Sequence, residues 1–490
     1  MCFLKNSFII LFCLLLFPIH GQTSVHSDSL SNGKRTDSLF TIPRNPLRAK
    51  GLIVASNVSV WAYDRFVIGG PYAQIDFDAI IRNIRTGFTG DNDGFLTNLL
   101  SHPYHGGMYF NAARSNGMDF WQSVPYAATG SLMWEYFLEN EPAAINDFVS
   151  SSIGGACFGE ITFRISDRVI DDRTVGFERF KREALLTIIS PIRGLNRLLS
   201  GEAWKHRSIK GNSVPSIPIS FYSTVGYRIV TDNSKKNNNV SQAVDYNIGF
   251  DYGNAFDLEN EKPYDFFSLK MTANLFSQQP IISRVNALGV LFSQNIDLRK
   301  PNQQLVWGVF QHFNFYQICA DTNNVSLNLY KISEAASAGP GLLIKSKLAN
   351  NVFFSSSAYL SAILLGGNQS DHFKPDIRNY NMGSGFSSKL NFELQLGNRT
   401  KLCLNWENYQ IYSWIGNLPA KAKSISSIPQ GDLGNANLTV TMLNFQYKIS
   451  KHLLLTAETD YYYRKNIYKY YPDVERSITE YKLSLGYLFE

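Results

Sequence analysis

The C-terminal part of the chain, from about residue 216 to residue 490, is dominated by segments in which apolar and polar residues alternate. In the last ten residues, one face of the expected strand carries Tyr481, Leu483, Leu485, Tyr487 and Phe489. Because successive side chains of a strand point to opposite faces, each segment has one face suited to lipid and one suited to a wetter surface. Many strands of this kind predict an antiparallel barrel that closes on itself in an outer membrane.

The alternation predicts about twelve strands. We expect them at about 216–231, 241–257, 263–278, 280–297, 303–319, 328–347, 351–365, 379–396, 399–413, 435–449, 452–467 and 473–490. Most exceed the roughly five to six residues usual in soluble sheets, and they reach the roughly 9–11 residues that cross a bilayer at a tilt. A break in the alternation at Met442 and Leu443 predicts a bulge or a misplaced strand end.

The expected connections differ in length according to their order in the chain. Counted along the chain from the first pair of strands, the even-numbered connections are short, for example residues 258–261, Asn350, 397–398 and 450–451. Long ones, at about residues 233–239, 366–378, 413–433 and 466–474, are odd-numbered. Membrane barrels have short periplasmic turns and longer outer loops, so this pattern favours a membrane barrel over a soluble β-sandwich.

The N-terminus predicts export. Lys5 precedes an apolar run that ends near Pro18, and small Gly21 offers a cleavage point, so residues 1–21 are expected to be a signal peptide. Cys13 is not expected to carry a lipid, because bulky Phe12 precedes it. The expected location is therefore the outer membrane of a Gram-negative envelope.

The composition agrees with a barrel and excludes other classes. Aromatic residues make up 14% of the chain, yet the mean hydropathy is only −0.15, because a barrel places apolar residues at every second position. The net charge of +6 is not concentrated in a basic cluster, which argues against nucleic acid as a partner. The five cysteines (Cys2, Cys13, Cys157, Cys319 and Cys403) form neither a disulfide framework nor a paired metal motif.

The region before the barrel has a different period. Residues 22–50 are expected to be a flexible leader, residues 51–200 a mainly helical domain, and residues 201–215 a linker. Helices are expected at 98–116, 119–139, 142–167 and 177–199, and a short strand at 75–81. The helical domain is expected either to lie in the periplasm or to plug the barrel lumen.

Small and charged residues predict close packing in the third of these helices. Ser151, Gly155 and Gly159 recur at intervals of four, so one helix face has almost no side chain. Another helix backbone or an acyl chain could approach that face closely. Glu160 and Arg164 are four apart and are expected to pair.

Several motifs in this region resemble an uncharacterised bacterial family. They are His102-Pro103-Tyr104-His105-Gly106, Tyr109-Phe110-Asn111-Ala112-Ala113-Arg114-Ser115, Gly130-Ser131-Leu132-Met133-Trp134-Glu135 and Ile145-Asn146-Asp147. The succession is similar to the domain of unknown function numbered 3943, over roughly residues 61–167. Ala143-Ala144 departs from the Pro-Ser-like pair expected before Ile145. The resemblance implies an envelope protein and supplies no catalytic residues.

The two histidines are the candidates for chemistry. His102 and His105 are three residues apart, so with Glu135 they could bind a divalent metal ion. Alternatively, one histidine could act as a general base oriented by Asp147, with an outer-membrane lipid as substrate. The structural alternative is that His102 caps a helix and His105 bonds a buried carboxylate.

The sequence therefore favours a non-enzymatic outer-membrane barrel whose helical domain plugs, gates or docks a partner. No cofactor is required by this interpretation. Outer-membrane lipids, the barrel-assembly machinery and a periplasmic protein are the expected partners. The alternative is a lipid-modifying or metal-dependent enzyme centred on His102, His105 and Glu135.

Overall fold

The computed structural model describes residues 39–91, 93–215, 217–234, 239–256, 262–275, 279–319, 328–372, 379–416 and 431–489. The chain forms two compact units. Of the described residues, the helical unit comprises 39–89, Tyr104–Ala144 and 158–215, and the barrel unit comprises those within 90–103, Ile145–Cys157 and 217–489. The expected signal peptide and most of the expected leader lie outside the described residues. Two segments of the region expected to be one helical domain thus group with the barrel.

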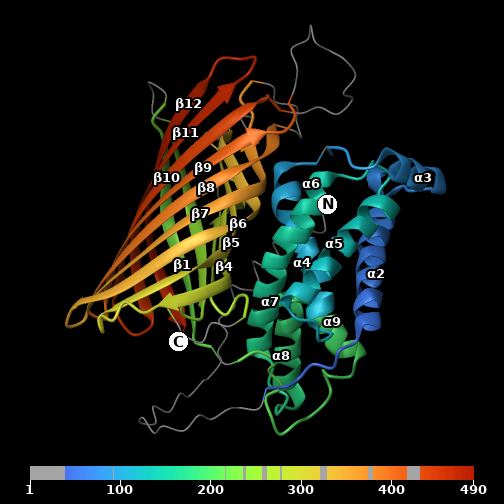
Figure 1. Ribbon diagram of the computed structural model, residues 1–490, viewed down its shortest axis with the longest axis horizontal. Helices are drawn as coiled ribbons and strands as arrows, with labels where there is room; N and C mark the ends of the chain where they lie inside the picture. Colours follow the sequence, from blue (N-terminus) through green and yellow to red (C-terminus); the bar gives the residue numbers. More distant parts are fainter. Residues whose placement is uncertain are drawn as a thin grey trace. The chain divides into compact units, whose positions relative to one another are not determined.

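Twelve antiparallel strands in the described part of the barrel unit close into one barrel, with β1 paired to β12 (Figure 1). The strands are β1 (Ile219–Asp232), β2 (Asn239–Tyr252), β3 (Phe267–Leu275), β4 (Ile282–Ile296), β5 (Gln303–Cys319), β6 (Asn328–Ala349), β7 (Val352–Gln369), β8 (Tyr380–Leu396), β9 (Thr400–Ser413), β10 (Gly434–Lys448), β11 (Leu453–Tyr468) and β12 (Val474–Phe489). The prediction of a helical region followed by an antiparallel barrel of about twelve strands is confirmed.

The outward face of the barrel carries large apolar side chains. Leu483 on β12 is 60% exposed and Leu360 on β7 is 55% exposed. Other exposed members of this outward set are Val225, Tyr227, Phe292, Trp307, Leu342, Phe386, Leu390, Phe392, Leu402, Leu404, Leu443, Phe445, Tyr461, Tyr481, Leu485 and Tyr487. Soluble monomers rarely expose so continuous an apolar surface. The barrel wall is therefore suited to lipid.

The expected strand limits agree with the observed ones within a few residues, except around β3. Residues 253–266 separate β2 from β3, so this even-numbered connection is longer than expected; the expected turn at 258–261 lies outside the described residues. Tyr264 in this connection has a positive φ of 64°, and its ring lies against Gly289 on β4. Aromatic residues that pack onto the wall here gave the connection the appearance of a strand.

The bulge expected at Met442 and Leu443 is absent. The register of β10 is continuous against both β9 and β11 across these positions. Leu438, Val440 and Met442 face inward and are buried, whereas Leu443 faces outward. The alternation was lost in the sequence because both faces of this strand are apolar.

The helices are α2 (Pro46–Tyr63), α3 (Phe77–Thr86), α4 (His102–Arg114), α5 (Phe120–Phe137), α6 (Ile145–Val149), α7 (Gly155–Val169), α8 (Gly176–Ile189) and α9 (Pro191–Leu199). A 3₁₀ turn spans Pro71–Ala73, and π-helical turns span Asp64–Ile68, Thr97–Ser101 and Ser150–Gly154. Among the described residues, no helix is both long and apolar enough to cross a membrane.

Local sequence sets several helix limits. Asp119 and Gln122 form a reciprocal capping box that starts α5. The expected strand at 75–81 is wrong, because the Asp76 side chain accepts a hydrogen bond from the Ala79 backbone N–H and caps α3. The helix expected at 177–199 is divided at Pro191, which starts α9.

Glycines allow close approaches in both units. In the helical unit, a Cβ added at Gly159 would lie 2.6 Å from the Phe110 ring. In the barrel unit, a Cβ added at Gly154 would lie 2.8 Å from the carbonyl oxygen of Ala335 on β6. Gly159, a member of the predicted small-residue face, thus lies against a side chain of its own unit, whereas Gly154, which is not a member, lies against the backbone of a strand.

Two glycine substitutions should change stability in opposite directions. Gly159→Ala should lower the free energy of unfolding of the helical unit by about 1–3 kcal/mol, because the methyl group would overlap the Phe110 ring. Gly51→Ala is the matched control: it lies inside α2 with nothing within 4 Å of an added Cβ, so it should stabilise by about 0.5–1 kcal/mol. Urea unfolding followed by helical circular dichroism measures both. Destabilisation by both would contradict this packing.

Candidate functional site

The lumen is arranged in layers, and the inward side chains of β11 give their order. Leu454 lines a cavity at one end. Glu458 and Asp460 follow in a charged layer, Tyr462 in an apolar layer, and Arg464 near the other end. The cavity lies at the barrel end that contains the first residues of β1 and the last residues of β12.

The charged layer joins opposite walls of the barrel. Arg228 on β1 donates two hydrogen bonds to Glu480 on β12, at 2.6 and 3.1 Å. Arg284 on β4 reaches across the lumen to Asp460 on β11, with 3.0 Å between Nη2 and Oδ2. Lys482 on β12 also contacts Asp460, at 2.6 Å. Because β4 and β11 are not neighbours, the walls must approach closely here.

A second group of charges completes this layer. Glu334 on β6 is fully buried and contacts Lys389 on β8 at 2.7 Å. Asn314 on β5 donates to the same carboxylate at 2.6 Å. The hydroxyl of Tyr316 donates to Glu407 on β9 at 2.7 Å. The carboxylates of this layer thus have cationic or hydroxyl partners, as buried charges require.

An apolar layer lies next to the charged one. Its buried members are Val230, Tyr316, Ile318, Tyr330, Ile332, Ile363, Tyr409, Ile411, Leu438, Val440, Met442, Tyr462 and Ile478. The rings of Tyr330 and Tyr462 stack with centroids 4.7 Å apart. The expectation of a hydrophilic interior is therefore wrong for this part of the lumen.

Beyond the apolar layer, the other end of the lumen carries another ion pair. Arg464 on β11 donates to both carboxylate oxygens of Asp371, at 2.6 and 2.8 Å. Asn466 and Tyr468 donate to the same Asp371 oxygen, at 3.0 and 2.6 Å. Among the described residues, the side chains of this ion pair and of the apolar layer are buried inside the barrel.

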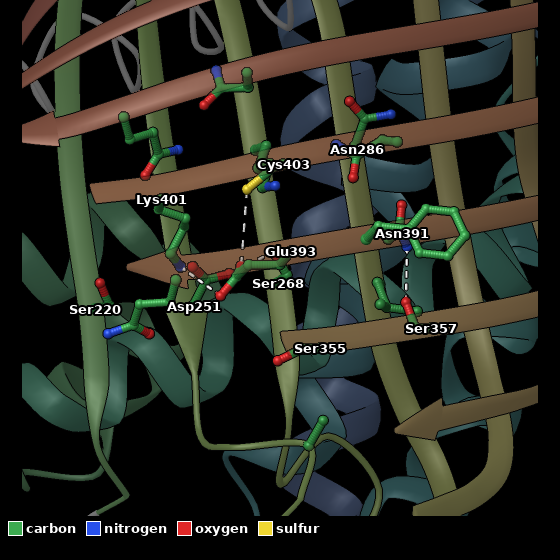
Figure 2. A pocket seen from close by; sticks show the side chains of 18 of the residues that line it. Ser220, Asp251, Ser268, Asn286, Ser355, Ser357, Asn391, Glu393, Lys401 and Cys403 are labelled. Carbon is green, nitrogen blue, oxygen red and sulfur yellow. Dashed lines mark hydrogen bonds and ion pairs between the residues drawn. The ribbon is translucent and has the colours of Figure 1, made fainter. Parts of the chain in front are cut away.

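A cavity of about 670 Å³ occupies the end of the lumen where the β8–β9 turn lies. Figure 2 shows Glu393, Lys401 and Cys403 together in its wall. Lys401 Nζ lies 3.1 Å from a Glu393 oxygen, and Cys403 Sγ lies 3.9 Å from the other. Ser355 and Asn391 line it as well.

The outer wall of the barrel binds the segment Gly90–Pro103. Phe315 on β5 faces outward but is fully buried, because the Phe95 ring lies 5.1 Å from it. Phe95 also meets Tyr380 at the start of β8, at 5.2 Å. The Tyr380 hydroxyl donates to the Asp93 carbonyl at 2.9 Å and contacts the Asn98 amide at 2.7 Å. This part of the wall faces protein instead of lipid.

The segment Ile145–Cys157 binds the same wall. The side-chain amide of Gln311 on β5 donates to the backbone carbonyl of Ile153 at 2.8 Å, and the Tyr264 hydroxyl donates to Oε1 of the Gln311 side chain at 2.8 Å. Each wall-bound segment contains a π-helical turn. Such turns are rare and are frequently found at functional sites.

Of the four predicted catalytic candidates, His102 and Asp147 lie together. His102 Nε2 is 3.5 Å from Asp147 Oδ1 and 3.6 Å from Asp93 Oδ2. Both aspartates belong to the barrel unit, as His102 does. Asp91, which the sequence analysis missed, accepts hydrogen bonds from Asn98 at 2.8 Å and from Asn146 at 3.2 Å. The Asp-x-Asp-Gly pattern that contains it is typical of a turn.

His105 and Glu135 belong instead to the helical unit. The hydroxyl of Tyr109 lies 2.9 Å from His105 Nε2 and donates to the Asn57 side chain. Glu135 accepts a hydrogen bond from the Ala144 backbone N–H at 2.8 Å. Burial raises the pKa of Tyr109 well above its usual value, and the charges of Glu135 and Glu139 raise it further.

No metal centre is formed by the described residues. They contain no group of three or more His, Cys, Asp or Glu side chains that could hold a metal ion. The predicted metal ligands His102, His105 and Glu135 do not form such a group, so metal binding stays a prediction without geometric support.

Glu160 lies at the centre of a buried charge cluster in the helical unit. Arg164 donates to it at 2.8 Å, as the spacing predicted, and Arg114 donates two hydrogen bonds at 2.7 and 2.9 Å. Burial alone would raise the pKa of Glu160, but the two guanidinium groups outweigh it and hold the pKa below its usual value. Arg114 is thus a structural residue.

A second buried cluster, which the sequence analysis missed, centres on Asp172. Arg179 and Arg197 each lie 2.8 Å from it, and Arg207 lies 2.6 Å from it. These arginines come from α8, α9 and the segment 201–215. Their spacing in sequence gives no sign that they converge.

The comparison with protein families matches a part of the chain that includes residues of both units. Residues 87–192 match the family described as a domain of unknown function (DUF3943). The resemblance to this family is thereby confirmed, but the match begins at residue 87 instead of the expected residue 61, and it extends beyond residue 167 to include α8. The comparison with curated proteins gave no match.

Solved structures similar to the chain are outer-membrane barrels and porins. OmpT, an outer membrane protein of Vibrio cholerae, is 9% identical with a TM-score of 0.23, covering 55% of this chain and 97% of that one. The NanC porin is 11% identical with a TM-score of 0.27, covering 53% and 98%. The KdgM porin is 10% identical with a TM-score of 0.23, covering 55% and 99%. The likeness concerns the fold alone.

Removing the carboxylate of Glu160 should destabilise the DUF3943 region strongly. Glu160→Gln would leave Arg114 and Arg164 buried without an anion, and the free energy of unfolding at pH 7 should fall by about 3–5 kcal/mol. Glu178→Gln, on an exposed ion pair, should have no measurable effect.

The pH dependence of the free energy of unfolding tests the role assigned to the Glu160 carboxylate. Since the pKa of Glu160 is lowered on folding from 4.5, its stabilisation is present above pH 4.5 and is lost as the pH falls through the folded pKa. Urea unfolding at pH 7 and at acidic pH should show this loss in the wild type and not in Glu160→Gln. An equal acid loss in both would contradict the assignment.

Proposed function

We propose that this protein is a non-conducting outer-membrane β-barrel that serves as a membrane-embedded platform for its DUF3943 region. The observation that carries the proposal is the filled lumen. The charged layer and the apolar layer together leave the interior side chains buried. In this proposal the barrel closes its lumen with its own side chains, and its outer wall holds the two segments of the family match that belong to the barrel unit.

The outward face supports the membrane location. Its leucines, phenylalanines and tyrosines are exposed on most strands, whereas inward positions carry the charges. A barrel satisfies all strand hydrogen bonds within the ring, so it can cross the bilayer without an open edge. Export by the expected signal peptide of residues 1–21 is part of the same proposal.

The wall-bound segments support the platform role. Phe95 buries the outward Phe315 and Tyr380, and the hydrogen bonds of Tyr380 and Gln311 fix the position of both segments. Lipid tails are as apolar as the side chains of these segments, so apolar contact alone does not favour a segment over lipid at the barrel wall. The hydrogen bonds between segment and wall therefore determine where each segment binds. The proposed role of the barrel is to hold these segments of the family domain in one place.

Conductance across planar bilayers tests the closed lumen. The wild type should insert and give no current steps, because the Tyr330 and Tyr462 rings and the ion pairs around them close the lumen. Replacing Tyr330, Tyr409 and Tyr462 by alanine together with Arg284→Ala and Asp460→Ala removes three rings of the apolar layer and the ion pair that crosses the charged layer, so steps should appear. Tyr481→Ala, on the outward face, is the control and should stay silent. Current steps from the wild type would contradict the proposal.

A second candidate function is a lipid-modifying enzyme, favoured by one observation. His102 lies between Asp93 and Asp147, and a carboxylate beside an imidazole can orient it as a general base. Of the two histidines considered from the sequence, this contact favours His102 as the base.

Comparison of envelope lipids tests this candidate. Cells with His102→Ala and cells with Asp147→Asn should share one altered lipid profile, since loss of a general base slows such a reaction by about 10²–10⁴-fold. His105→Ala is the matched control, because this histidine contacts Tyr109 inside the helical unit. Lipid profiles identical to the wild type in all three strains would remove support for the enzyme.

A further inference from the structure

The cavity at the end of the lumen has two chemically different sides. One side is apolar: Leu343 and Tyr359 belong to a buried cluster, and Phe256, Phe266 and Leu288 pack against it. All five also line the cavity. Aromatic and aliphatic side chains on one side of a concave site are typical of small-molecule binding.

The other side is cationic. Among the described residues that line the cavity, seven are Lys or Arg and four are Asp or Glu. The four acidic residues are Asp251, Glu393, Glu407 and Glu458. Each already accepts a short hydrogen bond or pairs with a cation: Ser268 donates to Asp251 at 2.6 Å, for example, and Arg284 contacts Glu458 at 2.9 Å.

Four of the seven basic side chains that line the cavity have no carboxylate partner among the described residues of the barrel. In the described part of the barrel, no carboxylate lies within ion-pair distance of the side-chain nitrogens of Lys270, Lys345, Arg399 or Lys448. Lys270 follows Phe266 on the same side of β3, and Lys345 follows Leu343 on β6, so both lie at the border between apolar and cationic sides. Lys345 lies 5.9 Å from the centre of the Phe256 ring.

We propose that this cavity binds a small organic anion with an apolar or aromatic body. Lys270 and Lys345 hold the anionic group, and the apolar side formed by Phe256, Phe266 and Leu343 holds the body. The volume of about 670 Å³ is that of a small-molecule site. Because the charged layer closes the lumen behind it, the ligand enters and leaves by the same end.

Cys403 provides a reporter inside the site. Its thiol lines the cavity and is half-buried (Figure 2). With the other four cysteines replaced by alanine, alkylation of the full chain in lipid nanodiscs by neutral N-ethylmaleimide reports on occupancy. Naphthalene-2-sulfonate is the probe, because it joins a single anionic group to an aromatic body.

Naphthalene-2-sulfonate should slow the alkylation of Cys403 in a saturable manner. The neutral 2-naphthalenemethanol and a naphthyl trimethylammonium cation should protect far less. In the Lys270→Gln/Lys345→Gln variant, the probe should bind roughly tenfold more weakly or worse, since two bonds to a charged group are lost. Lys465→Gln is the matched control: it lies outside the cavity on β11, pairs with Glu475, and should leave protection unchanged.

Three results would overturn the proposal: no protection by the probe, equal protection by the neutral alcohol, or unchanged protection in the double lysine variant. Heat-dependent gel mobility shows that each variant retains a folded barrel. A conducting wild-type barrel would contradict the closed lumen but would leave this binding test as it stands, so the two proposals fail separately.

Discussion

Charged side chains that point into the barrel must find partners of opposite sign there, and this requirement determines the shape of the lumen. Twelve strands would otherwise enclose a wider space than side chains can fill, since barrel diameter grows with strand number. Arg284 on β4 reaches Asp460 on β11, and Tyr330 on β6 stacks on Tyr462, which is also on β11. These contacts join walls that are not neighbours in the ring. The Arg228–Glu480 pair also joins β1 to β12, where the barrel closes.

On the outer wall, which faces lipid, polar groups of the bound segments must also find partners. Lipid would solvate the outward Phe315 ring as well as protein does. Apolar burial alone therefore does not explain why the segments Gly90–Pro103 and Ile145–Cys157 lie against the outer wall. Their polar contacts do: Tyr380 bonds the Asp93 carbonyl, and Gln311 bonds the Ile153 carbonyl. Carbonyl groups of the π-helical and turn regions find donors on the wall. The attachment is therefore specific in position as well as apolar.

The sequence predicts a segment well where one hydrophobic period, that of a strand or that of a helix, describes all of its residues. Long strands with lipid on one face alternate clearly, and their limits were predicted within a few residues. The prediction failed at Met442, because the inward face is also apolar there, and at residues 75–81, where the Asp76 cap outweighs a short apolar run. Glu160 and Arg164 are one helical turn apart and were paired correctly. The partners of Asp172 come from distant elements, and Asp93 approaches His102 through a turn, so sequence spacing could not reveal either.

The filled lumen limits where this barrel can act. Passage through it would require Arg284, Lys482 and Glu480 to lose partners while still excluded from water, and each broken buried pair costs about 3–5 kcal/mol. Several such pairs lie in one layer, so spontaneous opening is rare. The described charges of the cavity wall have partners, except for Lys270, Lys345, Arg399 and Lys448. Under the proposed function, the surfaces of the barrel unit that stay open to contact are the end cavity and the outer wall, and the wall-bound segments at residues 90–103 and 145–157 fall within the family match.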